Sequence, residues 1–178
     1  MFYCKEQKSE HYKNLLNEIL NYTAGLNSIY CYTDDKQNGL CAAWEETGFK
    51  AKRFAWILER DNKEFTGPQF PPDYELKIFR SGIDEDSWCS VINDAFRSSL
   101  GHVRMTPERI NEWRKEPSWL EDGLNILWHN GKAVGSIGIS KDTDDGENAV
   151  FIDSVGVIHE LHGKGLGKNL LRYGLKYA

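Results

Sequence analysis

The sequence lacks several features that would place it in whole classes of protein. No apolar run approaches the roughly 20 residues needed to cross a membrane, and the opening Met-Phe-Tyr-Cys-Lys-Glu has no signal-peptide core. The four cysteines show neither Cys-x-x-Cys spacing nor a histidine at ligand spacing. We therefore expect reduced thiols, no metal and a cytoplasmic protein.

An excess of positive charge is also missing. The 22 Lys and Arg residues are outnumbered by 27 Asp and Glu residues, which gives a net charge of −5. Proteins that bind nucleic acid or anionic membranes through general electrostatics carry the opposite balance, so we expect neither partner. At 178 residues, 40% of them hydrophobic, the chain can bury the core of one ordinary domain.

Proline is scarce, and three of the five prolines fall within residues 61–73. That composition predicts a linker or extended crossover between residues 1–60 and 74–178. Before it, hydrophobic spacing predicts a helix from Tyr12 that closes at Gly25 and a second helix at 38–47. Strands are predicted at 28–32 and 49–59.

Beyond the linker, residues 74–80 read as a strand, and an amphipathic helix follows around Trp88. Thr106-Pro107 marks the start of another helix, which extends to about residue 115. Asn130-Gly131 joins the strand patterns 124–128 and 132–140 and predicts a hairpin. A turn at 142–147, a strand ending at Val157 and a helix at 166–178 complete the pattern.

The segment from Val155 to Lys168 carries most of the functional information. Gly163, Gly165 and Gly167 alternate with bulkier residues between the predicted strand and helix. Glycines allow a sharp turn and close approach, and the N–H groups at a helix N-terminus attract phosphate. The pattern predicts a diphosphate-binding loop. A dinucleotide fingerprint needs its third glycine one position later, and a P-loop needs Ser or Thr where Asn169 follows Gly-Lys. A glycine-rich helix start without a ligand is the alternative.

The same residues resemble the acyl-CoA loop of the GNAT acetyltransferase superfamily. Val155-x-Val157 is followed by five residues and then by Gly163-x-Gly165-x-Gly167, with His159 where Pro is common and His162 where Gln or Arg is usual. The resemblance implies an α/β fold with a mixed sheet. Residues 75–178 follow the family's first half, and residues 1–60 resemble its last strands and helix.

This order implies that the N-terminal segment supplies the last strands of the sheet. The chain would then be a circularly permuted domain, or a piece of a tandem protein such as the mycothiol-synthase-like double GNATs. In either case we expect the two halves to share one sheet, within a chain or exchanged between the chains of a homodimer.

The resemblance also implies acetyl-CoA as co-substrate and a small-molecule amine as acceptor. The pantetheine arm would pair with the backbone of Val155 and Val157, and the N–H of Val157 could stabilise the oxyanion. The diphosphate would take N–H groups from His162, Gly163, Lys164, Gly165, Leu166 and Gly167. The side chains of Lys164 and Lys168 would add charge, and Arg172 could reach the ribose phosphate.

A general base and an acid are needed for direct attack of an amine on the thioester. Asp153 is our candidate base, because it would share a strand face with Phe151, Val155 and Val157, where burial raises a carboxyl pKa. His159 and His162 are alternatives. The family often has a Tyr acid where Trp44 stands. Tyr30 and Tyr32 are therefore candidate acids, with water as an alternative, or the thiolate leaves without an acid.

Two other functional classes fit the sequence less well. The Trp at position 44 favours a degenerate GNAT module that binds acyl-CoA or serves as an interaction half. The glycine turn alone also fits a phosphate-binding protein that does not use CoA.

Overall fold

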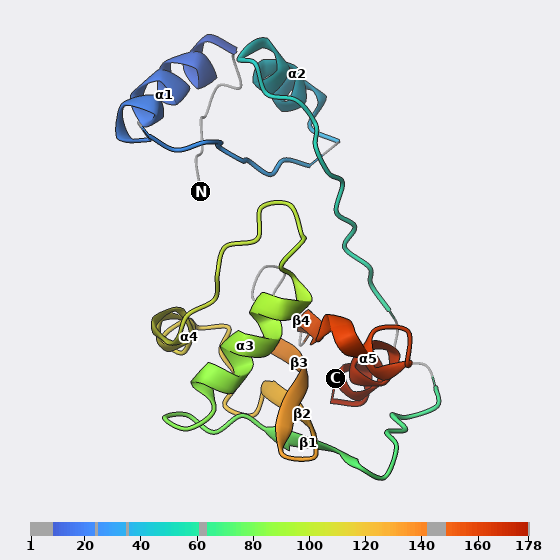
Figure 1. Ribbon diagram of the computed structural model, residues 1–178. Helices are drawn as coiled ribbons and strands as arrows, with labels where there is room; N and C mark the ends of the chain where they lie inside the picture. The colour runs from blue at the N-terminus through green and yellow to red at the C-terminus, as the bar shows by residue number, and fades with distance from the viewer. Residues whose placement is uncertain (1–8, 24, 35, 61–63, 142–148, 178) are drawn as a thin grey trace. The chain divides into compact units, whose positions relative to one another are not determined.

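The computed structural model describes residues 9–23, 25–34, 36–60, 64–141 and 149–177 (Figure 1). The chain divides into two compact units, Met1–Asn62 and Lys63–Ala178. No helix within the described ranges is both long enough and apolar enough to span a bilayer.

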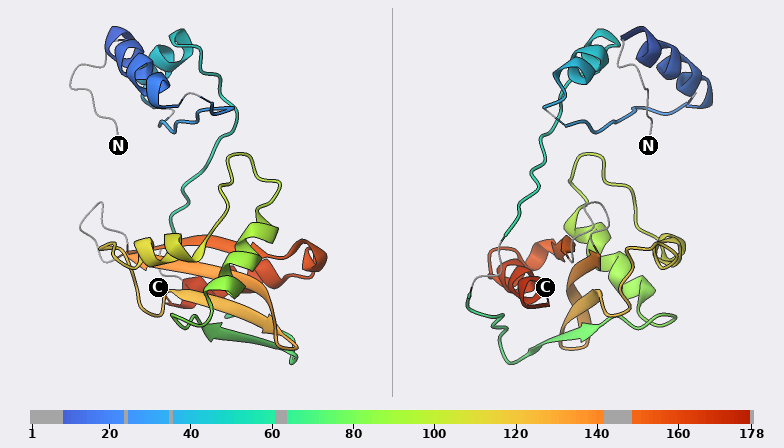
Figure 2. Two further views of the ribbon diagram at one scale, coloured as in Figure 1. Left: turned by 60° about the vertical axis from the view of Figure 1, so that its left-hand side comes forward. Right: turned by 180° about the vertical axis from the view of Figure 1, so that it is seen from behind.

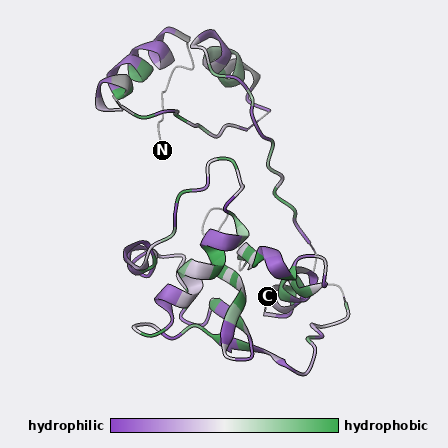
Figure 3. Ribbon diagram, in the orientation of Figure 1, coloured by the Kyte–Doolittle hydropathy of each residue, from purple (hydrophilic) through white to green (hydrophobic). Residues whose placement is uncertain are grey.

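The first unit consists of two helices around a small aromatic core. Helix α1 (Ser9–Tyr22) and helix α2 (Asn38–Glu46) confirm both predicted helices, and each carries hydrophobic and hydrophilic residues on different sides (Figure 3). The ring of Trp44 lies 5.3 Å from that of Tyr12 and 4.9 Å from that of Phe49. Gly48, at φ +93°, follows the end of α2 and turns Phe49 back onto this core.

The strands predicted at 28–32 and 49–59 are wrong for this structure. Both segments are described, and neither is a strand. A strand gains its ladder hydrogen bonds only from a neighbouring strand. All strands of the described residues belong to the second unit, so these segments stay irregular and leave Phe54 and Trp56 largely exposed. The N-terminal segment therefore adds no strand to the sheet here.

The second unit is built on a four-stranded antiparallel sheet in the order β1-β2-β3-β4 (Figure 2). Its strands are β1 (Tyr74–Ile78), β2 (Leu124–His129), β3 (Lys132–Lys141) and β4 (Val150–Val157). Its helices are α3 (Glu85–Ala95), α4 (Pro107–Trp113), the 3₁₀ turn η1 (His159–Leu161) and α5 (Leu166–Tyr177). The predicted elements after residue 74 are confirmed, except the turn at 142–147, which lies outside the described residues.

Helices cover both faces of this sheet, which confirms the mixed α/β class. On one face, Trp88 of α3 and Ile110 of α4 pack with Ile126 of β2. On the other face, Leu170 of α5 packs with Ile137 of β3. A Cβ at Gly174 of α5 would lie 2.9 Å from methyl carbons of Ile137 and Ile152, so glycine allows close helix–sheet contact there.

Part of the predicted linker is docked onto the second unit. Residues 64–73 contain no helix or strand, but Phe70 packs against the core under α5. The N–H of Gln69 also donates to Oδ1 of Asn169, at 3.0 Å. The proline-rich segment therefore contributes to the packing around the first turn of α5.

A buried carboxylate fixes the turn between β1 and α3. Asp84 is 3% exposed, and its Oδ2 accepts the backbone N–H of Arg80 at 2.8 Å and the Nε of Arg80 at 2.9 Å. The guanidinium Nη2 reaches Oδ1 at 2.9 Å. The hydrogen bonds from the Arg80 side chain hold the pKa of this carboxyl below its ordinary value, although burial acts in the opposite direction.

We predict that Asp84→Asn lowers the free energy of unfolding at pH 7 by about 1.5–3 kcal/mol, the range for a hydrogen bond to a charged group. A carboxyl with a lowered folded pKa stabilises above the unfolded value of about 3.9, and this contribution disappears as the pH falls through the folded pKa. Urea unfolding at pH 7, 5 and 3 should show that the difference in free energy of unfolding between wild type and variant becomes smaller only at pH 3. Glu121→Gln, on an exposed turn, is the control; an equal deficit at pH 3 would contradict the account.

Candidate functional site

The central irregularity of the sheet is a bulge in β4. Ser136 pairs with Gly156 and Gly138 pairs with Asp153, so three steps along β4 face two steps along β3. Ser154 has φ +47°, which is uncommon for a residue other than glycine. One extra residue in a strand twists it and changes which face its side chains occupy.

The bulge separates Asp153 from the valines with which it was predicted to share a face. Asp153 lies over Gly138, because a Cβ at Gly138 would run into its carboxylate. Val155 and Val157 instead pack with the core under α5. Regular alternation would have put all three on one side, so the predicted shared face is wrong. Asp153 therefore faces the α3 side of the sheet and the valines the α5 side.

Burial gives Asp153 the electrostatics of a candidate base. Loss of water around its carboxyl raises the pKa of Asp153 above the ordinary value, and a hydrogen bond from the Ser154 side chain offsets part of that effect. A carboxyl with a raised pKa is a better proton acceptor when it is ionised. Glycine at position 138 provides the room for this side chain on the sheet surface.

β4 forms an open edge of the sheet at its C-terminal end. The N–H of Ile158 donates to the carbonyl of Val134 at 3.0 Å, toward β3. Because backbone groups alternate in direction along a strand, the N–H and C=O of Val157 point away from β3, where the described sheet ends. An extended ligand could add to such an edge as a further strand.

The glycine loop connects this edge to α5. Gly163 and Gly165 have φ values of +77° and +76°, the left-handed region that glycine tolerates best. A Cβ at either position would meet nothing within 4 Å. Backbone conformation, not crowding, therefore requires these glycines. The first N–H groups of α5 have no partner within the helix, and they lie at the positive end of the helix dipole, which attracts anions.

His162 uses its groups differently from the prediction. Its N–H donates to the carbonyl of His159 at 3.1 Å, so this amide is already part of the η1 turn. Its ring Nε2 instead lies 2.7 Å from the carbonyl oxygen of Val157. The N–H groups available to a diphosphate in this loop therefore start at Gly163, and the His162 ring contacts the end of β4.

The other predicted residues divide between the two units. Lys164 and Lys168 are exposed on the loop and the first turn of α5, and their roles stay predictions. Tyr30 and Tyr32 lie on the irregular segment of the first unit, where the Arg53 guanidinium donates to the Tyr32 hydroxyl at 3.0 Å. Their roles as acids also stay predictions.

Two residues at this site gave no signal in the sequence. Oδ2 of Asp94, near the end of α3, accepts the N–H of His159 at 2.7 Å, although 65 residues separate them. The side-chain amide of Asn169 donates to the carbonyl of Gly165 at 3.3 Å. The Asp94 contact depends on the fold, because its partners are far apart in the sequence, whereas the Asn169 contact is local and spans four residues.

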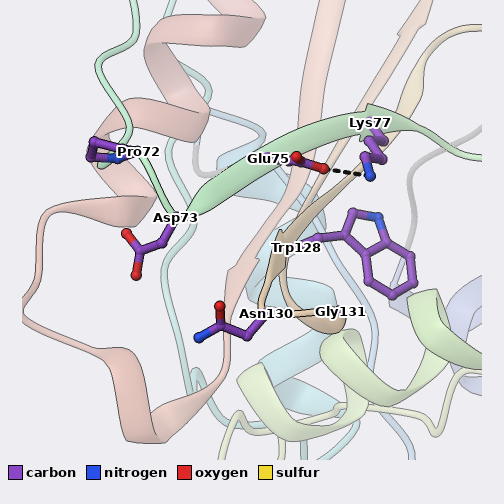
Figure 4. Close-up of a pocket in the computed structure, with 7 residues that line it drawn as sticks. All are labelled: Pro72, Asp73, Glu75, Lys77, Trp128, Asn130 and Gly131. Carbon is purple, nitrogen blue, oxygen red and sulfur yellow. Dashed lines mark ion pairs between the residues drawn. The ribbon is translucent and has the colours of Figure 1, made fainter.

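A separate hollow of about 290 Å³ lies at the opposite edge of the sheet (Figure 4). It is lined by Pro72, Asp73, Glu75, Lys77, Trp128, Asn130 and Gly131. Glu75 and Lys77 form an ion pair with each other, and both side chains are more than half exposed. None of the predicted site residues lines it. Its strand residues belong to β1 and β2, and β3 lies between them and β4. We assign it no role.

The sequence matches one family model and several curated proteins. The acetyltransferase (GNAT) family model matches residues 86–178, which are 93 of the 178 residues. A mycothiol acetyltransferase from Cellulomonas flavigena is 29% identical over 140 residues, covering 74% of this chain and 40% of the relative. One from Catenulispora acidiphila is 26% identical over 136 residues, covering 73% and 43%. The chain spans about two fifths of the length of these curated relatives.

Two solved acetyltransferase structures resemble part of this chain. A GNAT family acetyltransferase from Brucella melitensis, in complex with acetyl-CoA, has a TM-score of 0.49 and 21% identity, covering 58% of this chain and 67% of that one. A GCN5-related N-acetyltransferase from Sphaerobacter thermophilus has a TM-score of 0.49 and 22% identity, covering 63% and 34%. At TM-scores below 0.5, neither adds to what the sequence match establishes.

We predict that Asp153→Asn is more stable than the wild type at pH 7. Because burial raises the pKa of Asp153, its ionisation costs the folded state. The contribution of the neutral Asp153 carboxyl to folding is fully present below the pKa of the unfolded chain. It is lost as the pH rises through the pKa of the folded protein. Thermal melting should therefore give a higher melting temperature for the variant at pH 7 and equal temperatures near pH 3. A variant that is less stable than the wild type at pH 7 would contradict the raised pKa of Asp153.

Proposed function

Because this chain belongs to the acetyltransferase (GNAT) family, we propose that it transfers an acetyl group from acetyl-CoA to the amino group of a small-molecule acceptor. The observation that carries the proposal is the loop between β4 and α5. Two left-handed glycines there expose backbone N–H groups at the start of a helix, next to an open strand edge.

These two features match two chemically different parts of acyl-CoA. The diphosphate is an anion that suits the N–H groups and the helix dipole of α5. The pantetheine arm carries amides that can pair with an open strand edge, and Val155 and Val157 lie on that edge of β4. A ligand with both parts in sequence would engage the loop and the edge together. The exposed ammonium groups of Lys164 and Lys168 add a screened attraction to phosphate.

In the proposed reaction, the acceptor nitrogen attacks the thioester carbonyl of acetyl-CoA. A bond forms from nitrogen to the carbonyl carbon, and the carbon–sulfur bond then breaks to release CoA. Asp153 takes the proton from the attacking amine, directly or through water, and the N–H of Val157 donates to the developing oxyanion. The released thiolate takes a proton from water.

The proposed organisation of the chain is the end of one acetyltransferase repeat followed by the start of the next. The match to the Cellulomonas flavigena relative covers 74% of this chain, whereas Lys63–Ala178 makes up 116 of its 178 residues, about 65%. The match therefore extends into the first unit. A relative that matches this chain across the boundary between the units supports a tandem organisation over a circular permutation.

A second candidate function is an acyl-CoA-binding module without catalysis. Trp44 favours it, because this residue stands where the family often has a Tyr acid and is instead packed between Tyr12 and Phe49. The two candidates share the acyl-CoA site and differ in turnover. Release of free CoA thiol from acetyl-CoA, measured with a panel of amines, separates them.

Replacing a loop glycine should remove acyl-CoA binding. Gly165→Val forces a β-branched residue into the left-handed region, which costs roughly 1–2 kcal/mol or more, and moves the N–H groups of the loop. We expect the dissociation constant of acetyl-CoA, measured by calorimetry, to rise at least tenfold. Gly131→Val is the matched control, because Gly131 has φ +76° and open space around its Cβ position. It should lower stability and leave binding intact, and equal losses in both variants would remove the loop from the site.

The pH dependence of turnover should identify the base. If Asp153 accepts the proton, the rate of thiol release rises with pH through its raised pKa and then levels off. Asp153→Asn should reduce the rate and abolish that rise. A variant with the wild-type profile would exclude Asp153 as base and direct attention to His159 and His162.

A further inference from the structure

A chain of contacts runs from α3 to the last residue of β4. The carboxylate of Asp94 accepts the N–H of His159 at 2.7 Å and lies 3.5 Å from its ring Nδ1. The ring of His159 stacks on that of His162, with centroids 4.6 Å apart and an angle of 25° between the planes. The ring of His162 then reaches the carbonyl of Val157 at 2.7 Å.

The packing of α3 on β4 brings Asp94 into range. A Cβ at Gly156 would lie 3.1 Å from the Cβ of Ala95, so glycine allows the end of α3 to approach the strand closely. Asp94 precedes Ala95 and reaches His159, two residues after the end of β4. Arg97 donates to its Oδ1 at 3.0 Å, and the pKa of the Asp94 carboxyl lies below its ordinary value, mainly through the His159 N–H. Asp94 is therefore a charged acceptor that Arg97 contacts at Oδ1 and His159 contacts at Oδ2.

We propose that His162 is a positioning residue for acyl-CoA. Its ring holds the Val157 carbonyl, and through it the open edge of β4, at a fixed place relative to the glycine loop, while Asp94 and His159 hold the ring itself. This inference rests on the proposed function, since the groups that it positions are the two proposed to bind the diphosphate and the pantetheine arm.

The chemistry of the two histidines explains why they occur together. A hydrogen bond from Nε2 to a carbonyl requires a proton on Nε2, which fixes the tautomer of His162 when its ring is neutral. His159 contributes a backbone N–H to Asp94, which a proline at this position could not donate. Its ring also covers one face of His162. The two positions that depart from the family pattern therefore form one connected unit.

Only part of the Val157 carbonyl is used by this contact. A carbonyl oxygen has two acceptor sites, and the N–H of Val157 on the same open edge is left for a ligand. The His162 ring therefore fixes the position of the Val157 carbonyl without blocking its second acceptor site. Loss of the ring would let the residues after Val157 shift relative to the first turn of α5.

The test compares two replacements of His162 by calorimetric titration with acetyl-CoA. His162→Leu removes the donor, and we expect the dissociation constant to rise about tenfold. His162→Gln keeps an N–H donor at a similar reach and should bind within about threefold of the wild type. His129→Leu is the control, because His129 is also stacked, on Tyr74 at 4.3 Å, and hydrogen-bonded, to Asp73 at 2.7 Å, but lies near the opposite edge of the sheet. It should bind like the wild type.

The outcomes separate the inference from the proposed function. A wild-type protein that gives no binding heat contradicts the proposed function. Wild-type binding together with unchanged binding by His162→Leu, or equal weakening in the Leu and Gln variants, overturns the role of the hydrogen bond. Should the Leu variant not fold, long-range ¹H–¹⁵N spectra of the wild type decide, since the proton must be on Nε2 of His162. A neutral ring protonated on Nδ1 instead would overturn the inference.

Discussion

The bulge in β4 is the constraint on which the rest of the candidate site depends. One extra residue between Asp153 and Gly156 turns the carboxylate toward α3 and the two valines toward α5. A regular strand would have placed the acid and the valines on one face. With the bulge, a candidate base and an open peptide edge occur within five residues, on a strand held by the core on both faces.

Glycines then determine how closely the surrounding elements approach that strand. Gly138 leaves room for the Asp153 side chain, Gly156 admits the end of α3, and Gly174 admits α5. Interiors are packed densely enough that one methyl group at such a contact would force a shift. The loop glycines at 163 and 165 serve a different purpose, because their surroundings are open and only their backbone angles require them. Close packing and an accessible loop thus lie a few residues apart.

Local patterns were sufficient for much of this fold and for part of the site. The helices around Tyr12 and Trp88, the Asn130-Gly131 turn and the tight backbone of the glycine loop each have a cause within a few residues, and the structure confirms them. Phosphate binding by the loop stays a prediction. The bulge, the Asp94 contact and the ring of His162 depend on register and on residues far apart, which no local pattern encodes. Residues 28–32 and 49–59 have strand composition, but composition supplies no neighbouring strand, and the described residues offer them none.

The central claim is that backbone amides between Val157 and Gly167 bind the diphosphate and pantetheine of acetyl-CoA. Titration of the ¹⁵N-labelled protein with acetyl-CoA, followed through its amide resonances, tests it most directly. The account predicts that the largest shifts occur at Gly163, Gly165, Gly167 and Val157, and that free phosphate moves only the loop glycines. Shifts confined to residues around the Trp128 hollow, or none at the loop, would contradict it.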